Sequence, residues 1–271
     1  MNEFPIDDDL ELARRALVAA DLVSLPAFLS GKFKTSNKKD NTPVTEIDLA
    51  VEKIVRSVIS AARPTDSIYG EELSDSSWRT NPQPGRQWTI DPIDGTAGFA
   101  RGIPVWATLI SLLDDGVPVV GAVSAPAIGK SWIGAKGLGS WSWTSESETK
   151  RTLTVSGTRS LSDAVISYNS ASQWIASGRQ EALLQLATEA GVTRAFGDFW
   201  SYMLVAEGAI DMAGEPDLRP YDIAPVVPII EEAGGRFSSL DGDHSVWEGT
   251  ALATNGILHE EIIQLVSGGS S

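Results

Sequence analysis

Three consecutive apolar runs separated by turn signals place the strongest constraint on the fold of this chain. The runs cover residues 107–113, 118–125 and 131–135. Asp115-Gly116 separates the first two runs, and Pro126 follows the second. Short apolar runs joined by tight turns are typical of neighbouring strands. The sequence therefore predicts an antiparallel sheet in the middle of the chain.

Helical patterns lie on both sides of this predicted sheet. Apolar residues at helical spacing predict a helix over residues 10–28. A second helix is expected over residues 46–62, with Thr45 as its cap and Arg63-Pro64 at its end. The other expected strands are 67–69, 87–90, 153–155, 164–167 and 251–254, and the other expected helices are 181–189, 199–208, 223–233 and one starting near His259. This mixture implies a layered α/β or α+β architecture.

The length of 271 residues favours one or two closely packed subdomains. A boundary near residue 150 divides the chain into residues 1–150 and 151–271. No run approaches 18 consecutive apolar residues, so no membrane-spanning segment is predicted. The acidic N-terminus lacks the basic and apolar regions of a signal peptide, and we therefore expect a cytoplasmic protein.

Composition excludes several kinds of chemistry. The chain has no cysteine, which rules out disulfides, thiolate metal sites and a cysteine nucleophile. Its formal net charge is −15, so nucleic acid and anionic membranes are not expected as partners. An acidic protein that acts on a phosphate anion needs local cations, which favours a metal-assisted site over a purely basic pocket.

Three separated segments carry acidic side chains at the end of an apolar run or the start of a helix. They are Glu71-Glu72, Asp91 with Asp94, and Asp222. Mg²⁺ prefers oxygen ligands and usually keeps several waters, so a few carboxylates and a substrate phosphate complete its coordination. The alternative interpretation is that each acid is a solvated turn residue.

The hexapeptide Asp91-Pro92-Ile93-Asp94-Gly95-Thr96 is the most specific of these patterns. Pro92 fixes the local backbone, so that Asp91 and Asp94 can converge on one site with the Ile93 carbonyl between them. Gly95 permits a close approach of the backbone. Thr96 can begin a helix whose free N–H groups hold a phosphate. The hexapeptide alone therefore indicates a metal and a phosphate.

Over nearly its whole length the chain resembles the inositol monophosphatase superfamily of metal-dependent, lithium-sensitive phosphatases. Four segments carry the resemblance: Thr42–Asp48, Gly70-Glu71-Glu72, the hexapeptide, and Tyr221-Asp222-Ile223-Ala224 followed by Glu232-Ala233-Gly234-Gly235. Tyr221 stands where the family more often has tryptophan, and Pro225 where it has alanine. Neither departure removes an expected ligand.

The resemblance implies a layered α-β-α-β-α sandwich, with residues 1–150 carrying most metal ligands and residues 151–271 completing the metal site and the substrate pocket. Two or three Mg²⁺ ions would be held by the side chains of Glu71, Asp91, Asp94 and Asp222 and by the Ile93 carbonyl. By the same analogy we expect a homodimer, a small phosphate ester as substrate, and inhibition by lithium.

The resemblance also assigns catalytic roles. Glu71 and Thr96 would activate the attacking water, with Asp48 hydrogen-bonded to the Thr96 hydroxyl, and the backbone at Gly95 and Thr96 would bind the phosphate. Direct attack by water requires no covalent nucleophile. The chain has two histidines, His244 and His259, which lie outside the motifs and are expected on the surface.

The substrate is predicted from a different part of the chain. Residues 101–108 and 196–202 resemble the histidinol-phosphatase branch of the superfamily. Histidinol phosphate carries an ammonium and an imidazole, which Asp198 and Glu215, together with Asp94, would attract. Phe199 and Trp200 can flank such a cation, but the preferred interpretation is that they and Tyr202 belong to the core of a helix, and Trp106 is expected to pack internally.

Three alternatives remain open at this point. The first is an inositol-1-phosphate phosphatase, or one with broad specificity for sugar and polyol phosphates. The second is an enzyme for nucleotide 3′-phosphates, which would need a larger and more basic surface. The third is a catalytically silent regulatory homologue, which would be expected to lack a metal ligand or the water-activating threonine. The preferred prediction is hydrolysis of L-histidinol phosphate in histidine biosynthesis.

Overall fold

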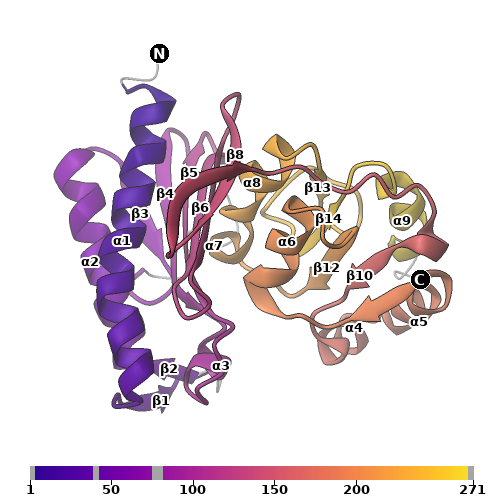
Figure 1. Cartoon of the computed structure of the whole chain (residues 1–271), viewed down its shortest axis with the longest axis horizontal. Helices are drawn as coiled ribbons and strands as arrows, with labels where there is room; N and C mark the ends of the chain where they lie inside the picture. The colour runs from indigo at the N-terminus through magenta and orange to yellow at the C-terminus, as the bar shows by residue number, and fades with distance from the viewer. Residues whose placement is uncertain (1–3, 39–42, 75–81, 268–271) are drawn as a thin grey trace.

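The computed structural model describes residues 4–38, 43–74 and 82–267. The fold consists of five layers of helices and sheets (Figure 1). Thr42, the first residue of the N-terminal motif, lies outside the described residues. Helices α1 (Ile6–Ser30) and α2 (Glu46–Ala62) form the first layer. The α2 helix has the predicted bounds because Thr45 caps it: its hydroxyl accepts from the Ile47 N–H, and Asp48 accepts from the Thr45 N–H.

The second layer is a seven-stranded sheet with its strands in sequence order. Strand β3 pairs parallel to β4, and each later pair is antiparallel. The strands are β3 (Ser67–Gly70), β4 (Arg86–Asp94), β5 (Ala107–Asp114), β6 (Val117–Ala125), β7 (Lys130–Ala135), β8 (Gly139–Thr144) and β9 (Ser147–Thr152). The three runs that predicted the sheet are therefore confirmed as β5, β6 and β7.

The fourth layer is a five-stranded sheet in the order β11-β10-β12-β14-β13. Its strands are β10 (Val165–Ser167), β11 (Val192–Arg194), β12 (Met212–Pro216), β13 (Arg236–Ser238) and β14 (Thr250–Thr254). Helices α6 (Asp198–Ala206), α7 (Pro220–Ile223) and α8 (Val226–Glu232) form the third layer, and α4 (Ala171–Ala176), α5 (Gln180–Glu189) and α9 (His259–Val266) form the fifth.

The hydrophobic core is divided in the way that this layering requires. Alternate residues of a strand face opposite sides of the sheet. In β5, Ile110 therefore packs with α1 and α2, whereas Leu109 packs with the central helices. In β12, Ala213 faces the central helices, whereas Met212 faces the outer helices. The predicted α-β-α-β-α sandwich is confirmed.

Three local predictions are wrong. Residues 153–155 are extended but form no strand; the Val155 N–H donates to the Ala233 carbonyl instead. The helix predicted over residues 223–233 is divided into α7 and α8, with Pro225 at the start of α8. His259 is fully buried between the hydroxyls of Ser238 and Thr254, each 3.0 Å away, and burial lowers its pKa to about 4.

His244 is exposed, as predicted, and lies 2.6 Å from a carboxylate oxygen of Glu231. Within the described part of the chain, no helix has the length and apolar character needed to cross a membrane.

Candidate active site

Three carboxylates from two distant parts of the chain converge between the two sheets. Asp91 and Asp94 lie at the end of β4, and Asp222 lies in α7. One carboxylate oxygen from each of the three lies within 4.8 Å of the others. The structure thus brings together three of the four carboxylates that the sequence predicted for the metal site.

Local backbone features turn these side chains toward each other. The pairing of β4 with β5 is irregular between Asp91 and Asp94, and Asp91 accepts a hydrogen bond from the Ile93 N–H at 3.0 Å. Gly95 follows with a φ of +85°, and a Cβ there would lie 3.0 Å from the Val105 carbonyl oxygen. Only glycine adopts this backbone conformation without strain in so little space.

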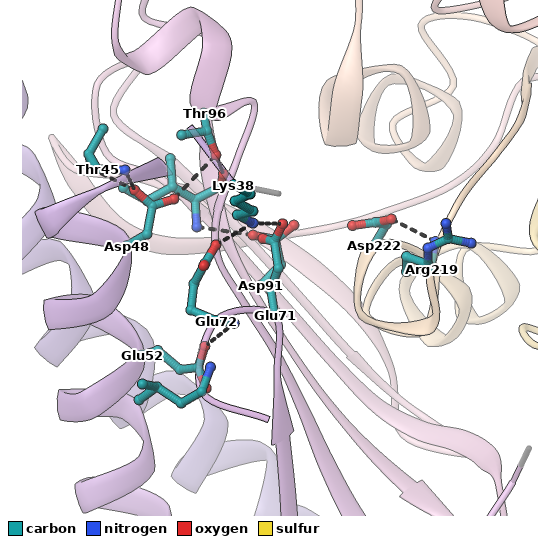
Figure 2. A network of polar contacts seen from close by, with 12 residues as sticks. Lys38, Thr45, Asp48, Glu52, Glu71, Glu72, Asp91, Thr96, Arg219 and Asp222 are labelled. Atoms are coloured by element: carbon teal, nitrogen blue, oxygen red, sulfur yellow. Dashed lines mark hydrogen bonds and ion pairs between the residues drawn. The ribbon is translucent and has the colours of Figure 1, made fainter. Parts of the chain in front are cut away.

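Asp222 is held by the first turn of α7. Its Oδ2 accepts a hydrogen bond from the Arg219 N–H at 2.7 Å (Figure 2). Burial raises its pKa to about 7, and the negative charge of Glu71 contributes to the rise. Burial raises the pKa of Asp91 and Asp94 well above its usual value, and repulsion between the neighbouring carboxylates adds to this effect.

Three buried or half-buried carboxylates this close together repel one another unless a cation supplies a compensating positive charge. A hard divalent cation with oxygen ligands would supply that charge, and Mg²⁺ has this preference. The donor set therefore fits the ion that the sequence predicted.

Glu71 has a different environment from these three acids. It follows β3, and its Oε1 lies 2.6 Å from the Lys38 Nζ, which also lies 2.5 Å from the Glu72 Oε1 (Figure 2). Burial alone would lower the pKa of Lys38, but the two carboxylates raise it above its ordinary value. Glu71 is close enough to Asp91 to raise the pKa of that residue. No sequence signal indicated Lys38.

Thr96 and Asp48 form the contact that the family resemblance implied. The Thr96 hydroxyl oxygen lies 2.8 Å from the Ile93 carbonyl oxygen and 3.2 Å from the Asp48 Oδ1. Asp48 is fully buried, and its other oxygen accepts from both the N–H and the hydroxyl of Thr45. The hydroxyl of Thr96 is thus fixed in direction at the start of the short helix α3 (Thr96–Phe99).

A continuous cleft extends from these residues into the C-terminal half. One pocket of about 470 Å³ includes Lys38, Glu71, Gly95 and Thr96 in its lining. A second pocket of about 250 Å³ is lined by residues that include Asp94, Asn169, Tyr202 and Glu215. Asp198 and Asp222 border both pockets.

The predicted substrate residues lie in the second pocket. Burial raises the pKa of Glu215 to about 8, and the Tyr202 hydroxyl donates to its Oε1 at 2.8 Å. The N–H of Phe199 donates to the Asp94 Oδ2 at 2.6 Å, which connects the start of α6 to the acidic cluster. Phe199 and Tyr202 are buried, as is Trp106, and these residues belong to the core.

Backbone strain is concentrated around this pocket. Asn169, Asp198 and Asp217 have positive φ angles of 53°, 47° and 63° and all three line it. Left-handed backbone in residues other than glycine is costly, and it is concentrated at functional sites. Neither Asn169 nor Asp217 was predicted, because no local sequence pattern specifies a left-handed residue that is not glycine.

The five-layer fold and its buried acidic cluster beside an ordered threonine hydroxyl define a metal-dependent phosphatase of the sugar-phosphatase type. A model of the inositol monophosphatase family matches residues 9–270. The chain belongs to this family.

Two relatives give the comparison more detail. The chain is 45% identical to the histidinol-phosphatase of Streptomyces coelicolor, over 94% of this chain and 96% of the relative. It is 44% identical to the histidinol-phosphatase of Mycobacterium tuberculosis, over 97% and 99%. Among solved structures, an inositol monophosphatase from Zymomonas mobilis superposes with a TM-score of 0.81 at 28% identity, covering 97% of this chain and 99% of that one.

Proposed function

We propose that this enzyme is a Mg²⁺-dependent phosphomonoesterase that hydrolyses L-histidinol phosphate to L-histidinol and phosphate, a step of histidine biosynthesis. One observation carries the choice of substrate: the 45% and 44% identity to two histidinol-phosphatases over nearly the full chain. The 28% identity to the solved inositol monophosphatase supports the inositol alternative less strongly.

Asp91, Asp94, Asp222 and the Ile93 carbonyl would hold two or three Mg²⁺ ions, with Glu71 as a further ligand. When bound, these ions neutralise the phosphate, lower the pKa of a water and stabilise the leaving oxygen. The burial and close approach of the three aspartates, which raise their pKa values, support the assignment, because a bound cation would compensate their negative charges.

The chain's own residues would orient the water and the phosphate. The Thr96 hydroxyl, fixed by the Ile93 carbonyl and Asp48, would hold the attacking water, and Glu71 would accept its proton. The backbone N–H groups of Gly95 and Thr96 would bind the phosphate. Every group of this predicted set is present, which argues against a catalytically silent homologue.

The second pocket has the charge that a cationic substrate requires. Asp198 and Glu215 line it together with Asp94. The pKa of Glu215, which burial raises to about 8, would fall when an ammonium or imidazolium group lies beside it. A neutral polyol would not stabilise the ionised carboxylate in this way, so the pocket favours a cationic leaving group.

The decisive experiment compares kcat/KM for L-histidinol phosphate, inositol 1-phosphate and a nucleotide 3′-phosphate under identical Mg²⁺ concentrations. We expect histidinol phosphate to be preferred, and we expect activity to disappear with a chelator and return with Mg²⁺. A preference for inositol 1-phosphate would refute the substrate assignment alone. Absence of turnover on any phosphate ester would refute the enzymatic proposal.

Three further proposals concern assembly, location and domain organisation, and only the homodimer rests on the family resemblance. The homodimer is testable by sedimentation, and the cytoplasmic location by cell fractionation. The proposed division into residues 1–150 and 151–271 falls within β9, which ends at Thr152, and the second sheet begins with β10 at Val165, so the change from one sheet to the other lies a few residues past the proposed boundary. The core between the sheets is shared by both parts, so the proposed subdomains would not be separated by a hinge.

A further inference from the structure

Glu52 is a buried carboxylate that the proposed mechanism does not use. It lies in α2, has no exposed surface, and points toward the turn that carries Glu71 and Glu72 (Figure 2). Its Oε2 accepts a hydrogen bond from the Glu72 N–H at 2.8 Å, and its Oε1 accepts one from the Leu73 N–H at 3.3 Å. The carboxylate therefore binds the backbone of the segment that contains the proposed metal ligand.

Arg56, one turn further along α2, completes this arrangement. Its Nε donates to the Glu52 Oε1 at 2.7 Å, and its Nη1 donates to the Ile68 carbonyl at 3.0 Å. Its Nη2 donates to the Ser74 hydroxyl at 2.7 Å, and that hydroxyl also accepts from the Gly70 N–H at 3.0 Å. Both sides of the turn, from the end of β3 to Ser74, are thus connected to one face of α2.

Gly70 makes this approach possible. A Cβ at Gly70 would lie 2.0 Å from the Glu52 Oε1, which is closer than two atoms that are not bonded to each other can come. The backbone of Gly70 is not left-handed, so glycine is not needed there for its conformational freedom. The space is occupied by the Glu52 carboxylate, and this explains the glycine in front of Glu71.

We propose that Glu52 is a positioning residue that sets the direction in which Glu71 presents its carboxylate to the metal site. A buried charge is costly unless it is hydrogen-bonded, and charge-assisted bonds to backbone N–H groups are strong. Groups that form hydrogen bonds with a metal-ligating residue, or with its backbone, fix the orientation of that residue and change its affinity for the metal. The inference rests on the proposed function, since it takes Glu71 as a metal ligand.

The test is Glu52→Gln, measured as the dissociation constant for Mg²⁺ by isothermal titration calorimetry on the full chain without substrate. The glutamine keeps the size of the side chain, but its amide NH₂ must face one of the N–H donors. We expect the dissociation constant to rise about 10- to 100-fold, which is the range found when residues that hydrogen-bond to metal ligands are replaced. We expect kcat at saturating Mg²⁺ to change less than this affinity.

Asp9→Asn is the matched control. Asp9 is also a buried carboxylate, 1% exposed, and it pairs with Arg63 and with Arg86, which lies at the opposite end of β4 from Asp94. This variant should lower the melting temperature but leave the Mg²⁺ dissociation constant unchanged. Ser74→Ala is a milder test of the same arrangement, because it removes only the acceptor for Gly70 and Arg56. It should weaken Mg²⁺ binding in the same direction by a smaller factor.

The outcomes separate the two proposals. If the wild type binds no Mg²⁺, the proposed function fails. If the wild type and Glu52→Gln bind Mg²⁺ equally well, only the positioning role is refuted. The positioning role is also refuted if Asp9→Asn weakens Mg²⁺ binding as much as Glu52→Gln does. Should Glu52→Gln not fold, the milder variant decides: an unchanged dissociation constant in Ser74→Ala refutes the role, and a raised one supports it.

Discussion

Replacing Asp222 by asparagine should make the metal-free enzyme more stable while it removes Mg²⁺ binding. Asp222 lies within 4.8 Å of Asp91 and Asp94, and its pKa is raised from 3.8 to about 7. Asparagine removes one negative charge from the cluster but keeps an oxygen that can accept the Arg219 N–H. The substitution therefore relieves repulsion without removing the hydrogen bond at the start of α7.

The sign and size of the effect follow from the raised pKa. The folded protein retains the Asp222 proton to a higher pH than the unfolded chain, so stability falls as pH rises from about 4 to about 7 and is constant above that. At about 1.4 kcal/mol per pH unit, the penalty in the wild type is under about 1 kcal/mol near pH 4 and about 4 kcal/mol near pH 8. The variant lacks this penalty, so its advantage grows with pH.

The assay is thermal unfolding in a chelator at several pH values, repeated with Mg²⁺. For a chain of this size the advantage corresponds to a melting temperature higher by about 5–10 °C near pH 8. Mg²⁺ should raise the melting temperature of the wild type but not that of the variant. Asp217→Asn is the control, because Asp217 is 70% exposed and asparagine tolerates its left-handed backbone. Equal pH slopes for the wild type and Asp222→Asn would refute the reasoning.

Three further substitutions test separate parts of the site. Glu215→Gln should lower kcat/KM for histidinol phosphate about 10-fold or more, without lowering it for inositol 1-phosphate, because a charged hydrogen bond is worth about 1.5–3 kcal/mol. Thr96→Ala should lower kcat about 100-fold or more in steady-state assays, whereas Thr96→Ser should retain most of it. Gly95→Ala should lower the free energy of unfolding in urea by about 1–3 kcal/mol, because its φ is +85° and the new Cβ would lie 3.0 Å from the Val105 carbonyl oxygen.

The sequence predicted elements well where local chemistry decides them. The bounds of α2 were correct because Thr45 and Asp48 form a capping box and Arg63-Pro64 ends the helix. Strands β8 and β9 were not predicted: β9, at the edge of the sheet, consists of polar residues, and β8 is a short strand in which serine alternates with tryptophan. The prediction that His259 lies on the surface was wrong. Its ring nitrogens lie beside the hydroxyls of Ser238 in β13 and Thr254 in β14, and no local pattern encodes these contacts.

The same distinction applies to the site. The hexapeptide was sufficient to predict that Asp91 and Asp94 converge and that Gly95 permits a close approach of the backbone. The approach of Asp222 depends instead on how α7 packs against the first sheet. The family resemblance supplied that contact, which spacing alone did not. The ion pairs of Lys38 with Glu71 and Glu72 were not predicted, since they join residues of different segments without a recognisable motif.

The two pockets of the cleft share Asp198 and Asp222, but several of their other side chains come from different parts of the chain. Glu71, Gly95 and Thr96 precede residue 100, whereas Asn169, Asp198 and Glu215 follow residue 165 and lie around the second pocket. Substitutions that reshape the second pocket therefore leave the groups that would attack the phosphorus in place. Such an arrangement allows a different leaving group to be accommodated by changing residues of the C-terminal half other than Asp222, while the proposed hydrolytic groups are retained.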